Sequence, residues 1–231
     1  MDDKIKTCLC EHCEFRDIVF ASLGEHDIRE LCDHKVERPF SKGDVISRQG
    51  DPITHFKYLK SGLVKLYRVT EDGEQQIITI TRPFEFISTM SVFGGDNYKY
   101  SVAALEDSVV CSVKIDFIKE LFLNNSRFAL NLFARVSKIS EKIIGQTLDI
   151  RQKNLAGRVA YVLLYLMRDI FKSRIFDIPV SRKEIADFIG MSTANVIRTL
   201  SDFKRDGIIR TTGKTIEIVD VDKLDIISKR G

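Results

Sequence analysis

The sequence predicts an α+β fold with an N-terminal β-roll, a long helix and a C-terminal winged helix-turn-helix. Short β-branched runs separated by glycines predict the roll, and an apolar repeat with helical spacing predicts the long helix. Two short helical patterns that meet at a glycine, with a hairpin pattern after them, predict the third part. We expect a cysteine-containing lead-in at 1–24, the roll at 25–125, the long helix at 126–150 and the winged helix-turn-helix at 151–231.

The roll is predicted from residues 38–113. Runs such as GLVKLYRVT and QQIITIT alternate with turns at a spacing of roughly 8–12 residues, which is typical of a barrel or a double-sheet roll. Glycines punctuate these runs at Gly43, Gly50, Gly62 and Gly73. The stretch EDGE at 71–74 is a strong hairpin signal because glycine accepts the positive φ that such a turn needs.

The long helix carries a narrow apolar stripe. Its members step along the chain by four, three and four residues and continue one heptad later: Leu132, Val136, Ile139, Ile143 and Ile150. Such a stripe can pack on the protein's own domain or form a seam between two subunits. Because the stripe is narrow and about three heptads long, we predict the seam of a homodimer.

The helix-turn-helix is predicted between residues 181 and 207. Ser181 and Glu184 form a capping-box pattern at the start of the first helix, and Gly190 suits its C-terminal turn. A second helix then spans 192–206 and ends at Gly207. Apolar residues on the facing sides of the two helices would hold the second helix so that it projects from the domain. The pattern IIRTTGKTIEIVD after it predicts a small hairpin.

The second helix of this motif has side chains that can read base pairs. Arg198 can bond a guanine bidentately, and Asn195 can bond an adenine in the same way. Hydroxyls and helix N-termini suit phosphates. We therefore predict that the partner is double-stranded DNA and that the contacts come from Arg182, Ser192, Thr193, Asn195, Arg198 and Lys204. The competing interpretation is that Arg198 pairs with Asp202 one turn later on the helix surface.

The charge of the chain is uneven. Residues 1–150 hold 20 Lys and Arg against 23 Asp and Glu, whereas residues 151–231 hold 16 against 10. A basic C-terminal part is typical of a protein that binds a polyanion. Neither a run of about 18 apolar residues nor an apolar signal core occurs. We therefore expect a cytoplasmic protein with no membrane partner and with reduced cysteines.

These motifs resemble the Crp/Fnr family, that of the cyclic-AMP receptor protein and the fumarate–nitrate reduction regulator. Residues 179–221 are similar to its winged helix-turn-helix, and GRVAYVLLYL is similar to the helix that opens that domain. The stretch FSKGDVISRQGDPITHFKYLKSGLVKLYRVTEDGEQQIITI is similar to its cyclic-nucleotide-binding-like roll, and the whole resemblance covers about residues 25–225. It implies a homodimeric transcription regulator whose roll senses a small-molecule effector and whose long helix carries the signal to the DNA-binding domains.

The effector pocket differs from that of the cyclic-nucleotide members. The resemblance aligns their ribose-binding glutamate with Thr89 and their phosphate-binding arginine with Tyr100. Without that arginine a buried phosphate lacks a charge-assisted partner, so we expect no tight binding of a cyclic nucleotide. The effector is therefore unknown, and the candidates for its pocket are Ser88, Thr89, Met90, Tyr100 and Ser101. The DNA-reading helix differs as well, because Ala194 stands at the family's usual glutamate, which predicts a different half-site.

The cysteines leave three interpretations open. In the oxygen-sensing members of the family, three N-terminal thiolates and one from the roll hold an iron–sulfur cluster. The matching positions here are Cys8, Cys10, Cys13 and Cys111. The one-residue gap between the first two makes it hard for both to reach corners of one cluster. A zinc site made from Cys10, His12, Cys13 and Cys32 lacks a standard spacing. Free thiols are the interpretation that we favour, so no metal is assigned.

We therefore predict a homodimeric DNA-binding transcription regulator that senses an unknown signal. The sequence has no nucleophile–base pair, P-loop or H-E-x-x-H motif, so we do not expect an enzyme. The alternative is a ligand-binding or redox-binding roll protein that does not bind DNA. That function would leave Arg198 and Asn195 without a role.

Overall fold

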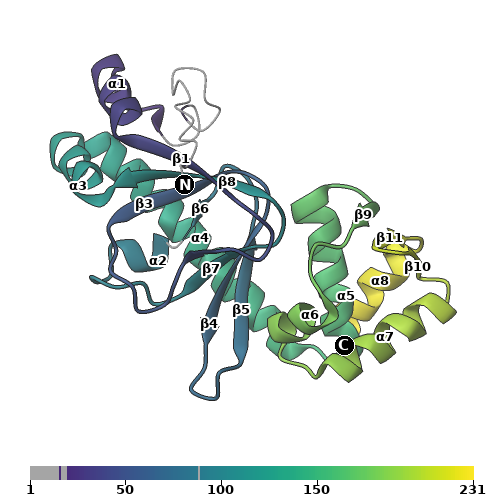
Figure 1. Cartoon of the computed structure of the whole chain (residues 1–231). Helices are drawn as coiled ribbons and strands as arrows, with labels where there is room; N and C mark the ends of the chain where they lie inside the picture. Colours follow the sequence, from purple (N-terminus) through teal and green to yellow (C-terminus); the bar gives the residue numbers. More distant parts are fainter. Residues whose placement is uncertain (1–15, 17–19, 88) are drawn as a thin grey trace. The chain divides into compact units, whose positions relative to one another are not determined.

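The computed structural model describes residues 16, 20–87 and 89–231. The chain forms two compact units, one made of residues up to 74 together with 79–143, the other of 75–78 and 144–231. The predicted α+β class is confirmed: the first unit holds two β-sheets and several helices, and the second holds a helix-turn-helix with a small sheet (Figure 1). The predicted domain boundaries stay predictions.

The N-terminal unit is a roll of two four-stranded sheets. The strand order is β1-β8-β3-β6 in the first sheet and β2-β7-β4-β5 in the second. The strands are β1 (Lys35–Phe40), β2 (Val45–Ser47), β3 (His55–Ser61), β4 (Val64–Val69), β5 (Gln75–Thr81), β6 (Phe86–Ile87), β7 (Ser101–Ala104) and β8 (Ser108–Lys114). The central strand of the first sheet is β8, which pairs antiparallel with both β1 and β3.

Two glycines make turns of the roll that other residues would strain. Gly73 has a φ of 78° in the hairpin between β4 and β5, where the Thr70 N–H donates to the Glu74 carbonyl at 2.9 Å. Gly62 joins β3 to β4 with a φ of 90°, and a Cβ there would lie 2.3 Å from Ser108 Oγ. The hairpin predicted at EDGE is therefore confirmed. At Gly62, both the positive φ and the close approach of Ser108 require a glycine.

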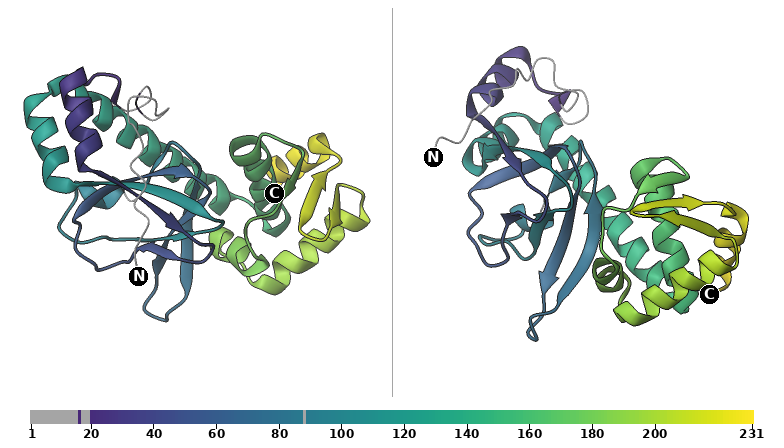
Figure 2. Two further views of the ribbon diagram at one scale, coloured as in Figure 1. Left: turned by 45° about the horizontal axis from the view of Figure 1, so that its top comes forward. Right: turned by 45° about the vertical axis from the view of Figure 1, so that its right-hand side comes forward.

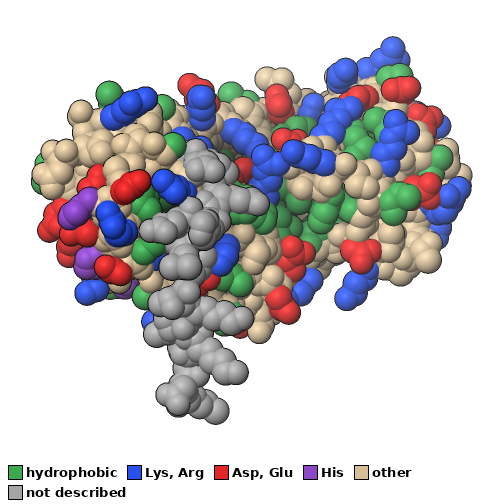
Figure 3. Space-filling view, turned by 90° about the horizontal axis from the view of Figure 1, so that it is seen from above, with side chains coloured by type: hydrophobic (Ala, Val, Ile, Leu, Met, Phe, Trp, Pro, Cys, Tyr) green, Lys and Arg blue, Asp and Glu red, His purple; other side chains and the backbone are tan. Residues whose placement is uncertain are grey.

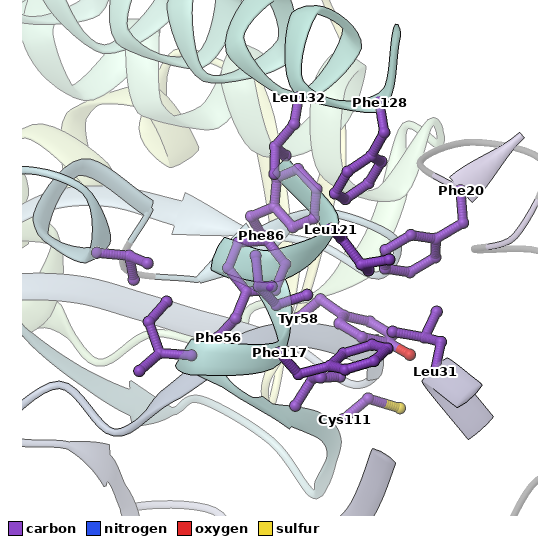
Figure 4. Packing of buried hydrophobic residues seen from close by; sticks show 14 of the residues in the cluster. Phe20, Leu31, Phe56, Tyr58, Phe86, Cys111, Phe117, Leu121, Phe128 and Leu132 are labelled. Atoms are coloured by element: carbon purple, nitrogen blue, oxygen red, sulfur yellow. The ribbon is translucent and has the colours of Figure 1, made fainter. Parts of the chain in front are cut away.

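Helices cover one face of the first sheet and share one core with it. They are α1 (Glu25–His34), α3 (Ile115–Asn124) and the start of α4 (Ser126–Gln152), with the short α2 (Thr89–Val92) between strands. Figure 2 shows α1 beside α3, and Figure 4 shows Phe56, Tyr58 and Cys111 from the strands lying with Phe128 and Leu132 of α4. The alternation of side chains along β3 sends Phe56 and Tyr58 into this core.

The side chains of the predicted dimer seam are buried or partly buried within the chain. Leu132 is 1 % exposed and belongs to the core cluster, and Val136 and Ile139 pack against that cluster. Ile143 and Ile150 are buried as well. The exposed apolar side chains of α4 lie on another face of the helix: Leu130, Phe133, Ile144 and Leu148. The N-terminal part of this stripe packs on the core of the first unit, and the dimer seam stays a prediction.

The C-terminal unit joins a helix-turn-helix to a three-stranded sheet. Its elements are α5 (Leu155–Tyr165), the π-helical η3 (Leu166–Phe171), β9 (Ile175–Asp177), α6 (Arg182–Ile189), α7 (Thr193–Arg205), β10 (Ile209–Thr212), β11 (Thr215–Ile218) and α8 (Val221–Arg230). The predicted hairpin is confirmed as β10 and β11, and β9 extends it to the order β10-β11-β9. Neither β9 nor α8 is predicted from the sequence.

The last helix, α8, packs along α5. Lys153 Nζ donates to the Ser228 carbonyl at 2.6 Å, and Arg168 forms an ion pair with Asp225. Asp220 caps the N-terminus of α8 by accepting from the Lys223 N–H at 2.8 Å. These contacts attach the end of the chain to the domain. No helix in the described part of the chain is long and apolar enough to cross a membrane.

Candidate nucleic-acid interface

Capping interactions define the ends of α6 and α7. Ser181 Oγ accepts from the Glu184 N–H at 3.1 Å, and the Glu184 carboxylate accepts from the Ser181 N–H at 2.8 Å, which confirms the predicted capping box. Gly190 ends α6 in the left-handed conformation, with a φ of 63°. Ser192 begins α7, and its Oγ accepts from the Asn195 N–H at 3.3 Å. The turn between the helices is therefore set by local contacts on both sides.

One arginine of α5 donates hydrogen bonds to the backbone of this turn. Arg158 Nη1 donates to the carbonyls of Ile189 at 3.2 Å and of Gly190 at 3.4 Å, and its Nε donates to the Lys153 carbonyl at 2.9 Å. The last carbonyls of a helix have no partner within the helix, so a side-chain donor stabilises them. Arg158 thereby ties the turn to the residues that lead into α5.

The apolar faces of α6 and α7 meet as the sequence predicts. Ile185, Ala186 and Ile189 of α6 are at most 2 % exposed. On α7, Val196 is fully buried and Leu200 is 6 % exposed. The small side chain of Ala186 allows the helices to approach closely. Burial of this face leaves the opposite face of α7 in solvent.

That outer face of α7 carries the predicted base-reading side chains. Arg198 is exposed, Asn195 is half-buried, and Arg198 Nη2 donates to Asn195 Oδ1 at 3.3 Å. Asp202 instead pairs with Arg205, with 2.9 Å between Arg205 Nη1 and Asp202 Oδ1. The competing interpretation, a pair between Arg198 and Asp202, is therefore wrong. The guanidinium and the amide lie together, and both face solvent.

Sequence reasoning missed one side chain of this face. Ile197 is 51 % exposed, next to the fully buried Val196. An exposed apolar side chain in a major-groove helix suits the methyl group of thymine. The signal was available, because Ile197 lies outside the apolar stripe that Val196 and Leu200 define. The hydrophobic pattern of the sequence does not say which group such an exposed side chain would contact.

Two predicted phosphate contacts have different surroundings. Lys204 is exposed near the end of α7. Arg182, the first residue of α6, is half-buried, and this burial lowers the pKa of its guanidinium. Its buried Nη1 makes no hydrogen bond within the described residues. Thr193 is half-buried and Ser192 is exposed at the N-terminus of α7, where backbone N–H groups favour anions.

Figure 3 gives the charge distribution on one face of the molecule. Lys and Arg side chains are spread over the part at the right, which is the C-terminal unit. Asp, Glu and His side chains gather at the left end, where Figure 1 has α1 and α3. This agrees with the excess of six positive charges that the sequence gives residues 151–231. The basic part of the chain is the part that contains the helix-turn-helix.

The candidate effector residues of the roll are only partly described. Ser88 lies outside the described residues, and Thr89 and Met90 begin α2 without described side chains. Ser101 is 2 % exposed, and its Oγ accepts from the Gln49 N–H at 2.9 Å. Tyr100 is half-buried. Ser101 therefore lies in the interior of the roll, where its hydroxyl is bonded to the backbone just after β2.

Three of the candidate metal ligands, Cys8, Cys10 and Cys13, lie outside the described residues. Cys111 is fully buried, and its thiol donates to Glu37 Oε1 at 3.7 Å. The described residues, 16, 20–87 and 89–231, contain no cluster of three or more His, Cys, Asp or Glu side chains that could hold a metal ion. The structure thus describes Cys111 as a packed core thiol beside a carboxylate.

Comparisons with known proteins match both units. The family model for the cyclic nucleotide-binding domain matches residues 37–125, and that for the Crp-like helix-turn-helix domain matches residues 157–227. The transcriptional activator FnrA of Stutzerimonas stutzeri is 27 % identical over 217 residues, which are 91 % of this chain and 88 % of that protein. The transcriptional activator Anr of Pseudomonas aeruginosa is 28 % identical over 220 residues, with the same coverage.

Solved structures share the fold. FixK2 from Bradyrhizobium japonicum aligns with a TM-score of 0.76 and 23 % identity, covering 84 % of this chain and 96 % of its own. TTHB099 from Thermus thermophilus, a transcriptional regulator of the CRP family, aligns with a TM-score of 0.72 and 19 % identity, covering 83 % and 96 %. At these identities the likeness concerns the fold alone.

Proposed function

This chain belongs to the Crp/Fnr family of DNA-binding transcription regulators, and from that premise we propose that it works as a homodimer whose two α7 helices read adjacent major grooves. Members of the family are transcription regulators and not enzymes. The proposal concerns the subunit contact, the residues that touch DNA and the signal that the roll receives.

The exposed apolar face of α4 supports a dimer. Phe133 is 70 % exposed, Leu130 is 68 % exposed, and Ile144 and Leu148 are more than half exposed. Spacings of three or four residues and their multiples bring such side chains onto one helical face. Leaving four large apolar groups of one helix in water is unfavourable, and a second copy of the same helix would bury them. We propose this stripe as the dimer contact in place of the one predicted from the sequence.

The observation that carries the DNA-binding proposal is the outer face of α7. Capped, packed helices hold Arg198 and Asn195 in solvent at adjacent turns of one helix. This is the residue pair that can recognise guanine and adenine edges, on a helix that a major groove admits. Arg182, Ser192, Thr193 and Lys204 surround it with groups that suit phosphates. Two such helices in a dimer would reach half-sites about 34 Å apart.

Selection from a random duplex library with the full-length protein tests the proposal. The enriched sequence should be a palindrome with half-sites about one helical turn apart, and it should differ from the family's usual site at the position facing Ala194. With Arg182 and Lys204 of two subunits on phosphates, log K should fall with log salt at a slope of about −3.6 or steeper. Enrichment of a single, non-repeated half-site, or affinity that does not change with salt, would contradict it.

We propose that the roll senses a ligand other than a cyclic nucleotide. Tyr100 supplies no positive charge for a cyclic phosphate, and the Ser101 hydroxyl already accepts a backbone N–H. Titration calorimetry should therefore detect no complex with cyclic AMP or cyclic GMP at micromolar concentrations. A micromolar or tighter complex with either nucleotide would overturn this part of the proposal.

The family resemblance also raises an iron–sulfur cluster. Its fourth ligand would be Cys111, but this thiol is fully buried and bonded to Glu37, whose carboxylate Lys35 and Lys60 also contact. Among the described residues, no group of three or more possible ligands includes it, so we assign no cluster. The absorption spectrum and metal content of protein purified without oxygen test this: we expect neither visible charge-transfer bands nor stoichiometric iron or zinc.

A further inference from the structure

The inner face of the first sheet holds an unusual lysine. Phe56 and Tyr58 of β3 point into the core beneath α4, so Lys57 between them points to the opposite face, toward the second sheet. There Lys57 Nζ donates to the Ile46 carbonyl and to Ser47 Oγ of β2, both at 2.8 Å. Lys57 therefore bridges the two sheets of the roll from within.

Other basic side chains share this face. His55 is two residues before Lys57 on β3 and lies opposite Lys114 of β8. Arg38 of β1 is two residues from Val36, which lies in the same cross-strand row as Lys57. Side chains two residues apart on a strand face the same way. Three neighbouring strands thus contribute Arg38, His55, Lys57 and Lys114, which we call the inner basic cluster.

The electrostatics agree with this placement. Burial, and next the charge of Arg38, lowers the pKa of Lys57 to about 8, and Asp51 opposes the shift. Burial lowers the pKa of His55 as well, followed by the charges of Lys57, Arg38 and Lys114. The charge of Arg38 therefore acts on both Lys57 and His55. The one carboxylate that acts on Lys57, that of Asp51, makes a smaller contribution than burial and Arg38.

On the opposite face of the same sheet, the lysines form ion pairs with a carboxylate. Glu37, which is 5 % exposed, forms ion pairs with Lys35 at 3.1 Å and with Lys60 at 2.9 Å. Within the described residues, Arg38, Lys57 and Lys114 have no such carboxylate, and both hydrogen-bond acceptors of Lys57 are neutral. A half-buried ammonium without an anion is unfavourable. The inner basic cluster therefore has a charge that a bound anion would compensate.

Neutral polar groups next to Lys57 complete the surroundings. Tyr98 is 4 % exposed, its ring centroid lies 5.3 Å from Lys57 Nζ, and its hydroxyl donates to the His55 carbonyl at 3.1 Å. Tyr98 opens the segment that leads to Tyr100 and Ser101, the positions that the family resemblance equates with a phosphate-binding pair. Lys57 thus offers, from the facing strand, a cation close to the segment where Tyr100 supplies none.

We propose that the effector of the roll is a small multivalent oxyanion, either a phosphate ester or a di- or tricarboxylate, whose acidic group binds Lys57 and Ser47 with Arg38 and Lys114 at its rim. This rests on the proposed function of the roll as the sensing part. An oxyanion accepts charge-assisted hydrogen bonds from the ammonium and a further bond from the serine hydroxyl. Arg38 and Lys114 lie in cross-strand rows on either side of the row of Lys57, and cations placed in this way favour a ligand with more than one negative charge.

Calorimetric titration of the full-length protein with inorganic pyrophosphate and, separately, with citrate at constant ionic strength tests the proposal. At least one of them should bind saturably, and Lys57→Met should weaken that binding at least tenfold. Lys119→Met removes an exposed lysine of α3 and should leave the binding unchanged. The preferred probe distinguishes phosphate esters from polycarboxylates. Saturable binding of neither anion, or equal binding by Lys57→Met, would overturn the proposal.

A second measurement does not depend on the folding of Lys57→Met. In wild-type protein with ¹³C-methylated lysines, which keep their charge, the Lys57 signal is the one missing from Lys57→Arg. Its titration midpoint should lie near 8 and should rise when the binding anion is added, because an anion favours the ammonium. An unchanged midpoint at saturating anion would overturn the proposal.

DNA binding measured in parallel separates this inference from the proposed function. Anions also compete with DNA at the basic helix-turn-helix, but that competition is the same in wild type and Lys57→Met. Specific DNA binding together with anion binding that ignores Lys57 would remove the inference and leave the function. Lys57-dependent anion binding without specific DNA binding would do the reverse.

Discussion

Replacing Arg198 by alanine tests how the protein reads DNA. In the free protein Arg198 is exposed, and its Nη2 donates to Asn195 Oδ1 at 3.3 Å. Loss of so exposed a side chain should change the free energy of unfolding by no more than about 0.5 kcal/mol. On DNA, a bidentate arginine–guanine contact is worth about 1–3 kcal/mol of discrimination. A dimer has two such contacts, so the loss should be about 2–6 kcal/mol, or roughly 30-fold to 10⁴-fold in affinity.

Fluorescence anisotropy with the selected palindrome and its single-base variants measures this loss. Wild type should prefer one base pair in each half-site that Arg198→Ala no longer distinguishes. The salt slope should change little, because the contact is to a base and releases few counterions. Lys204→Ala is the control: it removes a positive charge from the same helix, should weaken binding equally on all sequences, and should reduce the slope by about one per subunit.

An Arg198→Ala protein that behaves like Lys204→Ala would contradict the base-reading role of Arg198. Equal loss of affinity on every duplex, with a shallower salt slope, would assign Arg198 to a phosphate. Retention of both affinity and base preference would mean that α7 is not the reading helix. A circular dichroism melt of Arg198→Ala that matches wild type is needed for either conclusion.

Three further changes test other parts of the structure. Phe133→Asp should give a folded monomer in sedimentation equilibrium. Leu132→Ala should keep the dimer and lower the free energy of unfolding by about 2–5 kcal/mol. A dimer with Phe133→Asp and a monomer with Leu132→Ala would favour the seam predicted from the sequence. Ser181→Ala should cost about 0.5–2 kcal/mol in urea unfolding by removing the cap of α6, and Ser201→Ala, within α7, should cost far less. Folding lowers the pKa of Lys57 from 10.5 to about 8. Between about pH 8 and pH 10.5 the unfolded chain therefore binds more protons at Lys57 than the folded protein does, so the free energy of unfolding should rise with pH over this interval. The rise should be absent from Lys57→Met in urea unfolding at each pH, and a rise of equal size would assign it to other groups.

The sequence predicted helix ends and turns well, because one or two residues determine each of these features. The capping box at Ser181 and Glu184, the left-handed Gly190 and the hairpin at Gly73 depend on hydrogen bonds and backbone angles within a few residues. The helix-turn-helix therefore followed almost completely from the chain. The short β9 was missed because three residues carry too little periodicity to be distinguished from a loop.

The location of the dimer contact depends on more than the local sequence. An apolar stripe predicts that a helix face is covered, but the covering partner is a property of the whole fold. On α4 the regular stripe through Leu132 meets the chain's own core, and the less regular set around Phe133 remains exposed. The inner basic cluster was missed on similar grounds. Its members come from three strands, and only the register of the sheet brings them to one face.

Packed side chains lie between the proposed anion site and the proposed dimer face. Lys57 lies on β3 between Phe56 and Tyr58, and these two rings pack in the cluster that contains Leu132. Leu132 and Phe133 are adjacent on α4 and face the core and the solvent, respectively. A shift of β3 that accompanies anion binding must be accommodated by this close-packed cluster, and a rotation of α4 that moves Leu132 also moves Phe133. The N-terminal unit thus contains a continuous packed path from the inner face of the roll to the surface where a second subunit would bind.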